Sequence, residues 1–238
     1  MLTFAEIERA LVVTAHPDDV DFGAAGTVAT LTDAGVAVTY CLVTDGDAGG
    51  TDRSITRHEM AMLRRREQTD AAQRVGVTDL VFLGHGDGRV QPTLQLRADI
   101  SAVIRRVRPR VVITQSPERN LDSIYASHPD HLAAGEAAVC AVYPDARNPF
   151  AFPELFDEAL EPWAVDEVWI MGGRTGPHPI DVTAAVDRKI AALMCHVSQH
   201  PDPDHTATMV REWMASTAKQ AGLPDGASAE TFRVVNTR

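Results

Sequence analysis

The sequence predicts an α/β protein: a single Rossmann-like domain with a mostly parallel sheet, helices on both faces, and a site at the C-terminal ends of the strands. Short apolar runs alternate along the chain with helix-like segments, which favours parallel strands joined by helical crossovers. With 238 residues, the chain is long enough for one large domain. Because no repeat or linker divides it, we expect residues 1–238 to form one domain.

The first half of the chain alternates strands and helices regularly. The segments "ALVVTA" (10–15) and "VAVTYCLVT" (36–44) are continuous apolar runs, as in strands covered on both faces. Residues 23–33 between them predict a helix that Gly35 can terminate. Residues 57–75 predict a long polar helix ended by Gly76, and "DLVFLG" (79–84) predicts the third strand.

The second half continues the alternation with longer interruptions. A helix is expected at 96–107, a fourth strand at "RVVITQ" (110–115), and, after a long loop, a helix that begins near His128. The proline-rich stretch 143–163 is expected to be an irregular excursion within the domain. The remaining expected elements are a strand at 165–171, helices at 184–197 and 208–221, and a closing strand at 231–235.

The composition excludes several classes of protein. The formal charge is −11, and the only compact basic cluster is "LRRRE" (63–67), so a nucleic-acid partner is not expected. No stretch approaches the ~20 apolar residues of a membrane span, and the N-terminus lacks a signal-like pattern. We therefore expect a cytoplasmic protein. Its three cysteines are widely separated in the sequence, so we expect them to be reduced thiols. A homo-oligomer is possible.

The segment "TAHPDDVDFG" (14–23) places one histidine and three aspartates directly after the first strand. In open α/β sheets, ligands bind outside the carboxyl ends of the strands. The segment lacks the GxGxxG pattern of a dinucleotide site. Three carboxylates would repel a phosphate, whereas a bound cation would relieve their repulsion. The segment thus predicts a metal site, although Asp21 is better interpreted as the N-cap of the following helix.

A second segment, "SHPDHLAAG" (127–135), supplies a partner for the first. His128 and His131 are three residues apart at the start of a helix, a spacing that places both imidazoles on one face. Two histidines and one carboxylate with an open fourth position are typical of catalytic zinc. The alternative is a pair of capping or core histidines.

A third His-Pro-Asp sequence occurs at 200–202, near His196 and His205. Pro201 and Pro203 should prevent a helix there and favour an exposed turn. The segment is a rival metal site, although it follows a helix and not a strand end.

With these motifs in view, the chain resembles the LmbE-like or PIG-L family of zinc-dependent N-deacetylases, which includes glucosaminyl-inositol deacetylases and amidases. The resemblance runs over most of the chain. It is strongest in "VVTAHPDDVDFGAAGT", "RRREQTDAAQRVGV", "LVFLGHGDG" and "SHPDHLAAGEAA". The paired AHPDD and HPDH motifs are its specific part.

The resemblance implies one Zn²⁺ per chain, or another divalent metal, held by His16, Asp19 and His131. Asp18 would be the general base, with support of His16 as its alternative role. His128 would meet the developing oxyanion as a cation or acid, with Asp130 orienting it and raising its pKa.

Two further residues, Arg64 and Asp87, align with family positions that hold sugar hydroxyls. For Arg64, the alternative is a solvated face, because it stands among three arginines. Some family members place a tyrosine two residues before the first histidine of HPDH. Here that position is Ala126, and Tyr125 precedes it.

The expected function is hydrolysis of the amide of an N-acetylglucosamine-type sugar or glycoconjugate by metal-bound water, releasing the acyl group. The alternatives are an amidase acting on a thiol-cofactor conjugate, a metal-dependent hydrolase of another bond such as a phosphoester, and a non-catalytic metal-binding member of the fold. Specificity is expected to lie in loops at 47–57, 118–127 and 148–163.

Overall fold

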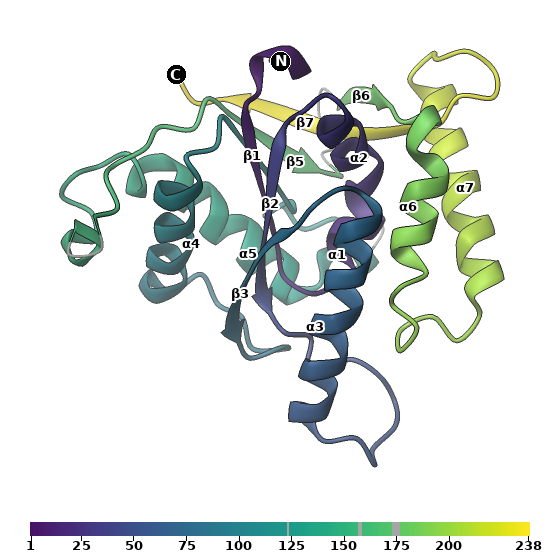
Figure 1. Ribbon diagram of the computed structural model, residues 1–238, viewed down its shortest axis with the longest axis horizontal. Helices are drawn as coiled ribbons and strands as arrows, with labels where there is room; N and C mark the ends of the chain where they lie inside the picture. Colours follow the sequence, from purple (N-terminus) through teal and green to yellow (C-terminus); the bar gives the residue numbers. More distant parts are fainter. Residues whose placement is uncertain (123, 157–158, 173–176) are drawn as a thin grey trace.

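The computed structural model describes residues 1–122, 124–156, 159–172 and 177–238. Within these residues, one seven-stranded sheet has the strand order β3-β2-β1-β4-β5-β7-β6 (Figure 1). Its strands are β1 (Arg9–Thr14), β2 (Ala37–Thr44), β3 (Asp79–His85), β4 (Val111–Thr114), β5 (Glu167–Met171), β6 (Pro177–Asp181) and β7 (Ala229–Asn236).

Strands β1 to β5 are parallel, as the alternating pattern predicts. Leu11 on β1 aligns with Thr39 on β2 and with Val112 on β4. Strand β7 is antiparallel to both β5 and β6, so the sheet is mostly parallel with an antiparallel edge. The predicted fold class is therefore confirmed.

Helices cover both faces of the sheet. One face carries α1 (Asp19–Gly23), α2 (Ala25–Asp33), α3 (Arg57–Arg74), α6 (Val186–Leu193) and α7 (Pro203–Gln220). The other carries α4 (Leu94–Val107) and α5 (Pro129–Cys140). The remaining short helical segments of the described residues, four 3-10 and one π, are η1 (Phe4–Glu6), η2 (Ile124–Ser127), η3 (Ala141–Asp145, the π segment), η4 (Pro153–Phe156) and η5 (Thr183–Ala185).

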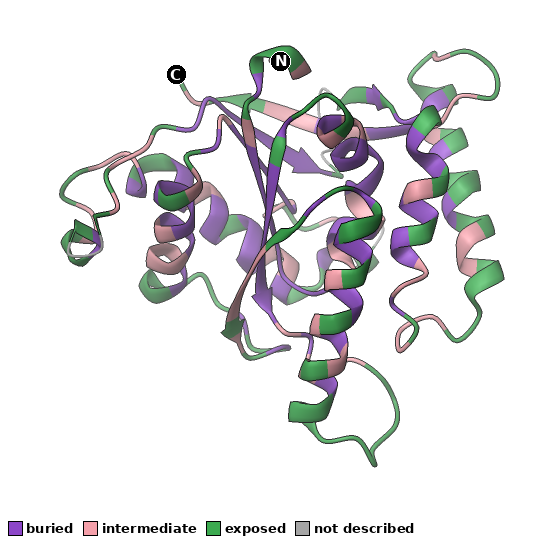
Figure 2. Cartoon of the chain, viewed as in Figure 1, coloured by how far each residue is buried: buried purple, intermediate pink, exposed green. Residues whose placement is uncertain are grey.

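Alternate residues of each central strand point to opposite helical layers. Val12 belongs to the apolar cluster beneath α2, α3 and α6, whereas Leu11 and Val13 belong to the cluster beneath α4 and α5. Figure 2 shows the resulting pattern: the central strands are buried, and the helices are exposed only on their outer faces. This double burial explains why the strands are continuous apolar runs.

The helix predicted at 23–33 begins earlier and is broken. Asp19 starts α1, and α2 follows after Ala24, whose φ of −146° lies outside the helical range. The interpretation of Asp21 as an N-cap is wrong, because Asp18 occupies that position. Asp21 is fully buried inside α1, where its carboxylate accepts a hydrogen bond from Gln68 and contacts His196 Nε2 at 2.8 Å.

The C-terminal part differs from prediction in two places, and prolines are the reason in both. Pro203 does not prevent a helix: it is the first residue of α7, where a missing N–H costs nothing. Asp202 caps this helix by accepting a hydrogen bond from the His205 amide. Strand β6 was not predicted because it contains Pro177 and Pro179, which a sheet tolerates at an edge.

None of the helices in the described part of the chain combines the length and apolar character needed to cross a bilayer.

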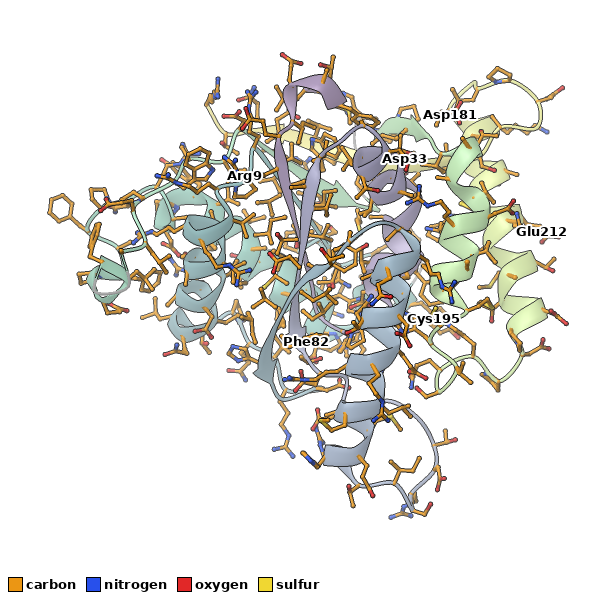
Figure 3. All side chains as sticks on the ribbon, viewed as in Figure 1. Arg9, Asp33, Phe82, Asp181, Cys195 and Glu212 are labelled. Carbon is orange, nitrogen blue, oxygen red and sulfur yellow. The ribbon has the colours of Figure 1, made fainter. Side chains whose placement is uncertain are left out.

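The three cysteines are free thiols. Cys195 lies between α6 and α7 (Figure 3).

The position of β1 creates the crevice in which a site can form. The order of the parallel strands reverses at β1, which lies between β2 and β4. The chain leaves β1 toward α1 on one face and leaves β4 toward α5 on the other, so the two loops diverge. Gln115 ties the strand ends together by accepting a hydrogen bond from the Ala15 amide. Both histidine motifs border this crevice.

Close packing of α5 against the end of β4 fixes the second motif. A Cβ atom at Gly135 would lie 2.4 Å from the carbonyl oxygen of Gln115, so only glycine fits without a shift of the helix. We predict that Gly135→Ala lowers the free energy of unfolding by about 1–3 kcal/mol, the scale of overpacking. In an exposed helix, the same change would stabilise by about 1 kcal/mol. Urea unfolding measures the difference, with exposed Glu136→Ala as control; a stabilised Gly135→Ala variant would contradict the packing.

Candidate metal centre

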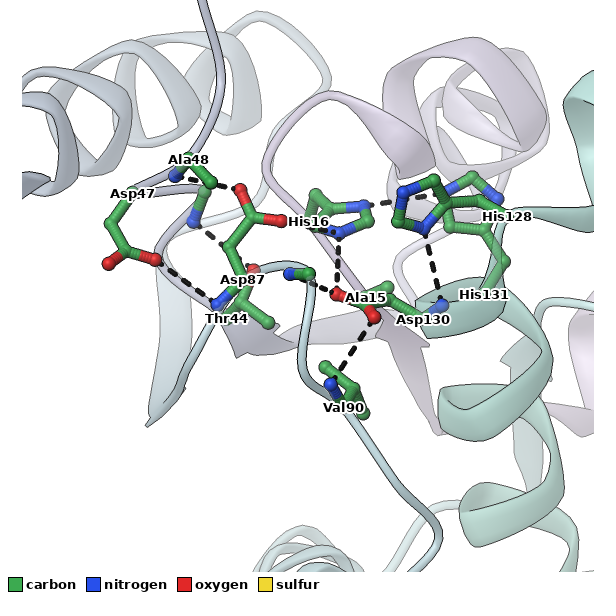
Figure 4. A network of polar contacts seen from close by, with 12 residues as sticks. Ala15, His16, Thr44, Asp47, Ala48, Asp87, Val90, His128, Asp130 and His131 are labelled. Carbon is green, nitrogen blue, oxygen red and sulfur yellow. Dashed lines mark hydrogen bonds and ion pairs between the residues drawn. The ribbon is translucent and has the colours of Figure 1, made fainter.

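The imidazole of His16 has polar partners at both ring nitrogens, and Figure 4 shows it among Asp87, Asp130, His128 and His131. On one side, its Nδ1 atom is 3.3 Å from Asp19 Oδ2 and 3.3 Å from His131 Nε2. On the other side, its Nε2 atom is 3.2 Å from both Asp87 Oδ1 and Asp130 Oδ2. His131 Nε2 also lies 3.0 Å from Asp19 Oδ1. Residues from the loops after β1, β3 and β4 thus meet at one point.

The contacts among His16, Asp19 and His131 are close to the spacing of metal ligands. They measure 3.0–3.3 Å, with His16 Nδ1 facing Asp19 Oδ2 and His131 Nε2 facing the other oxygen, Asp19 Oδ1. Tetrahedral zinc with bonds of about 2.0–2.1 Å separates neighbouring ligand atoms by roughly 3.3 Å. This spacing can accommodate a divalent ion, and these are the three residues that the family resemblance implies as ligands.

Two triplets among the described residues bring one donor atom each within 4.8 Å of one another: His16 with His128 and His131, and His16 with Asp87 and Asp130; neither includes Asp19. The second triplet is already engaged by backbone amides. Asp130 accepts from Gly88 and Val90 at 2.7 and 3.2 Å, and Asp87 accepts from Ala48 at 3.0 Å. Carboxylates fixed in this way can accept a hydrogen bond from His16 Nε2–H, which leaves Nδ1 available to a metal ion.

The carboxylates around His16 change its proton affinity. Burial alone would lower its pKa, but hydrogen bonds with Asp130, Asp19 and Asp87 outweigh burial and raise the pKa to about 12. Metal binding at Nδ1 would therefore displace a proton. At Asp19, burial alone would raise the pKa, but hydrogen bonds with His131 and His16 outweigh burial and lower it. Asp19 is therefore an ionised carboxylate that can bind a cation.

Asp130 does not orient His128 in the expected way. Its carboxylate faces His16, and only its backbone N–H reaches His128, donating to Nδ1 at 3.2 Å. The pKa of His128 is lowered by burial and by the neighbouring His16 and His131; the negative charge of Asp130 opposes this without reversing it. A neutral His128 that accepts at Nδ1 carries its proton on Nε2.

Asp18 adopts a backbone conformation that is uncommon for a residue with a side chain. Its φ of 84° lies in the left-handed region. Gln68 holds it there by accepting a hydrogen bond from its amide at 2.9 Å. Arg64 Nη2 donates to Asp18 Oδ2 at 3.0 Å. Burial raises the pKa of Asp18 to about 6, with Arg64 lowering it and Asp19 raising it further. Two adjacent carboxylates thus have pKa values that move in opposite directions.

Arg64 is buried, so the interpretation as a solvated face is wrong. It is 4% exposed and donates to the carbonyl oxygens of Pro17 and Gly46 at 2.5 and 3.2 Å. A Cβ at Gly46 would lie 2.4 Å from its Nη1 atom, and the φ of 67° at Gly46 also favours glycine in the loop after β2. The neighbouring Arg65 lies over the Phe82 ring, with 4.9 Å between its guanidinium carbon and the ring centroid.

A cavity of about 820 Å³ opens beside Asp19 and His131. Asp18, Asp19 and His131 line it, but Arg64 and Asp87 are not among the described residues that do. The expected contacts of Arg64 and Asp87 with sugar hydroxyls therefore remain predictions. Tyr125 lines the mouth and is 93% exposed. The side chain of Ala126 lies outside the described part of the structure.

The rival site near residues 196–205 does not come together. His196 is fully buried and contacts Asp21, whereas His205 is exposed on α7. Among the described residues, these histidines belong to no group that could hold a metal ion. The contacts of Gln68 with Asp18 and Asp21 were not predicted, since a glutamine within a polar helix gives no signal of its partners.

Comparison with known proteins identifies the family. Residues 11–142 match the PIG-L family, described as GlcNAc-PI de-N-acetylase. The chain therefore belongs to the PIG-L family.

Three relatives add detail. The diacetylchitobiose deacetylase of Thermococcus kodakarensis is 32% identical over 199 residues, covering 84% of this chain and 73% of the relative. A probable N-acetyl-α-D-glucosaminyl L-malate deacetylase of Bacillus cereus is 39% identical over 137 residues, covering 56% and 60%. The N,N′-diacetylchitobiose deacetylase structure from Pyrococcus horikoshii superposes with a TM-score of 0.89 at 28% identity, covering 98% and 85%.

We predict that His131→Ala removes stoichiometric zinc, because it deletes one of three donors. Asp87→Asn should retain the site but weaken zinc affinity about 10- to 100-fold, the usual cost of losing a partner of a ligand. Competition with a chromogenic chelator measures both effects. His85→Ala is the control, since His85 contacts Asp99 away from the centre. Unchanged affinity in Asp87→Asn would exclude a supporting role for this carboxylate.

Proposed function

We propose that this chain is a zinc-dependent amide hydrolase that removes the acyl group from an N-acyl glucosaminide. The observation that carries the proposal is the cluster of His16, Asp19 and His131, whose side chains contact one another at 3.0–3.3 Å next to a cavity that Asp18, Asp19 and His131 line. The three relatives support the substrate class, since each is named for deacetylation of a glucosaminyl compound. We further propose that residues 1–238 act as one domain.

Zinc bound by His16, Asp19 and His131 would polarise the amide carbonyl and lower the pKa of the attacking water. Asp18 then has the properties of a general base. A carboxylate with a pKa of about 6 is largely ionised at neutral pH, yet basic enough to accept a proton. Arg64 fixes its Oδ2 atom from the buried side. Asp19, with its lowered pKa, remains the ligand.

His128 is suited to the oxyanion. Its ring lies 5.0 Å from that of His16 and 5.2 Å from that of His131, measured between centroids. Because Nδ1 accepts the Asp130 amide, a neutral His128 carries its proton on Nε2 and can donate a hydrogen bond from that atom. We therefore propose that His128 stabilises the oxyanion as a neutral donor and not as a permanent cation.

We expect Asp18→Asn to retain zinc and to lower kcat by roughly 10²–10⁴-fold, the usual contribution of a general base. Asparagine tolerates the left-handed backbone, so the change removes basicity without adding strain. Amine release from a chitobiose-type N-acetylglucosaminide and zinc content are measured together. Exposed Asp225→Asn is the control. Loss of zinc would make Asp18 a structural residue, and full activity would exclude it as the base.

The activity should fall as the pH drops through the pKa of Asp18, because protonation removes the base. The pKa of about 6 holds for the metal-free site, and a bound cation would lower it. Arg64→Met removes a charge that lowers this pKa, so the acid limb of kcat/KM should move to higher pH. Arg64→Lys, which keeps the charge, should move it less. An acid limb unaffected by either change would argue that another group titrates.

A further inference from the structure

The cavity beside the metal centre has two chemically different sides. The loop after β4 contributes polar residues, namely Ser116, Glu118, Arg119 and Asn120. The second side, formed by residues of α1, β5, α6, α7 and β7, is mainly apolar. Its large apolar side chains are Phe22, Met171, Met209, Trp213 and Met214. Asp19 and His131 line the same cavity, so both kinds of surface are available to a substrate whose amide lies at the metal centre.

The apolar side is part of the packed structure and extends to its surface. Met171 and Met214 are 8% and 1% exposed and form the deep part. Met209 and Trp213, one turn apart on α7, are 46% and 54% exposed and form the rim. A Cβ at Gly23 would lie 2.5 Å from the Met171 sulfur, so glycine lets α1 pack against this methionine.

The charged groups on this side are satisfied within the protein. Lys189 Nζ donates to Glu230 Oε1 at 2.6 Å and to the Phe22 carbonyl at 2.5 Å. Glu230 also accepts from the amides of Gly26 and Thr27 at 3.0 and 2.7 Å. Thr217 and Thr231 are the remaining polar side chains of this side among the described residues. Sugar hydroxyls placed here would lose hydrogen bonds to water with little in return.

We propose that this side binds an acyl chain longer than acetyl, so that the preferred substrates are N-acyl glucosaminides with medium-length alkyl chains. The inference rests on the proposed amide hydrolysis. The amide divides such a substrate into a polar sugar and an apolar chain, matching the two sides of the cavity. Water supplies hydroxide to the acyl carbon and hydrogen to the nitrogen as the C–N bond breaks, giving a fatty acid and a free amino sugar.

A series of N-acyl glucosamines tests the proposal with the zinc-loaded full chain. The N-acetyl, N-butanoyl, N-hexanoyl and N-octanoyl compounds share one sugar, and released amine is measured for each. Burial of each methylene should raise kcat/KM by about threefold to fourfold until the side is filled. A maximum of kcat/KM at the N-acetyl compound would overturn this proposal, whereas the proposed deacetylase activity would still stand. If no member were hydrolysed, the proposed function itself would fail.

A second series separates the acyl chain from the other group that could occupy the apolar side. Octyl and methyl N-acetylglucosaminides differ only in the aglycone. We expect their kcat/KM values to differ by less than those of the N-octanoyl and N-acetyl compounds. A larger gain from the octyl aglycone would assign the apolar side to the aglycone and overturn the proposal.

Variants of the rim test the location. Trp213→Ser and Met209→Ser should each lower the ratio of kcat/KM for octanoyl over acetyl substrate, by about tenfold for the tryptophan. Leu94→Ser on α4 is the matched control: Leu94 is 67% exposed and lies outside the cavity, so the ratio should not change. Circular dichroism establishes that each variant is folded. An unchanged ratio in both folded rim variants would overturn the proposal.

Discussion

The concentration of carboxylates around one imidazole is the constraint on which the rest of the site depends. Asp19, Asp87 and Asp130 all contact His16 within 3.3 Å, in a place where His16 is 8% exposed. Buried like charges repel strongly unless positive charge is supplied. His16 supplies part of this positive charge, and the metal ion that we propose would supply the rest.

The fold brings this charge together by its topology. The strand order reverses at β1, so the loops after β1 and β4 diverge and leave room between them. Gln115 and Gly135 then fix how far apart the two loops can be, one by a hydrogen bond across the strand ends and the other by allowing α5 to approach the backbone. The position of the donor atoms is thus set by packing that is not itself part of the chemistry.

Neighbouring residues in the first motif acquire different chemistry from different contacts. Asp19 faces two histidines, which lower its pKa, whereas Asp18 points back toward Arg64 in a buried position that raises its pKa. The left-handed backbone at Asp18 turns the two side chains apart. Gln68 supports this turn and also reaches Asp21, which contacts buried His196. The ligand and the proposed base therefore depend on a polar network that extends behind the site.

The sequence by itself determined the parallel sheet and indicated the cluster of His16, Asp19 and His131, because both rest on local signals: apolar strand periodicity, and His-Pro-Asp motifs placed directly after strands. Tertiary structure decided the rest. Asp130 contacts His16 across 114 residues, and Arg64 reaches Asp18 across 46. The apolar side of the cavity comes from α7, far along the chain and outside the loops expected to set specificity. Such partners meet only through packing, and no spacing within the sequence records which carboxylate will face which imidazole.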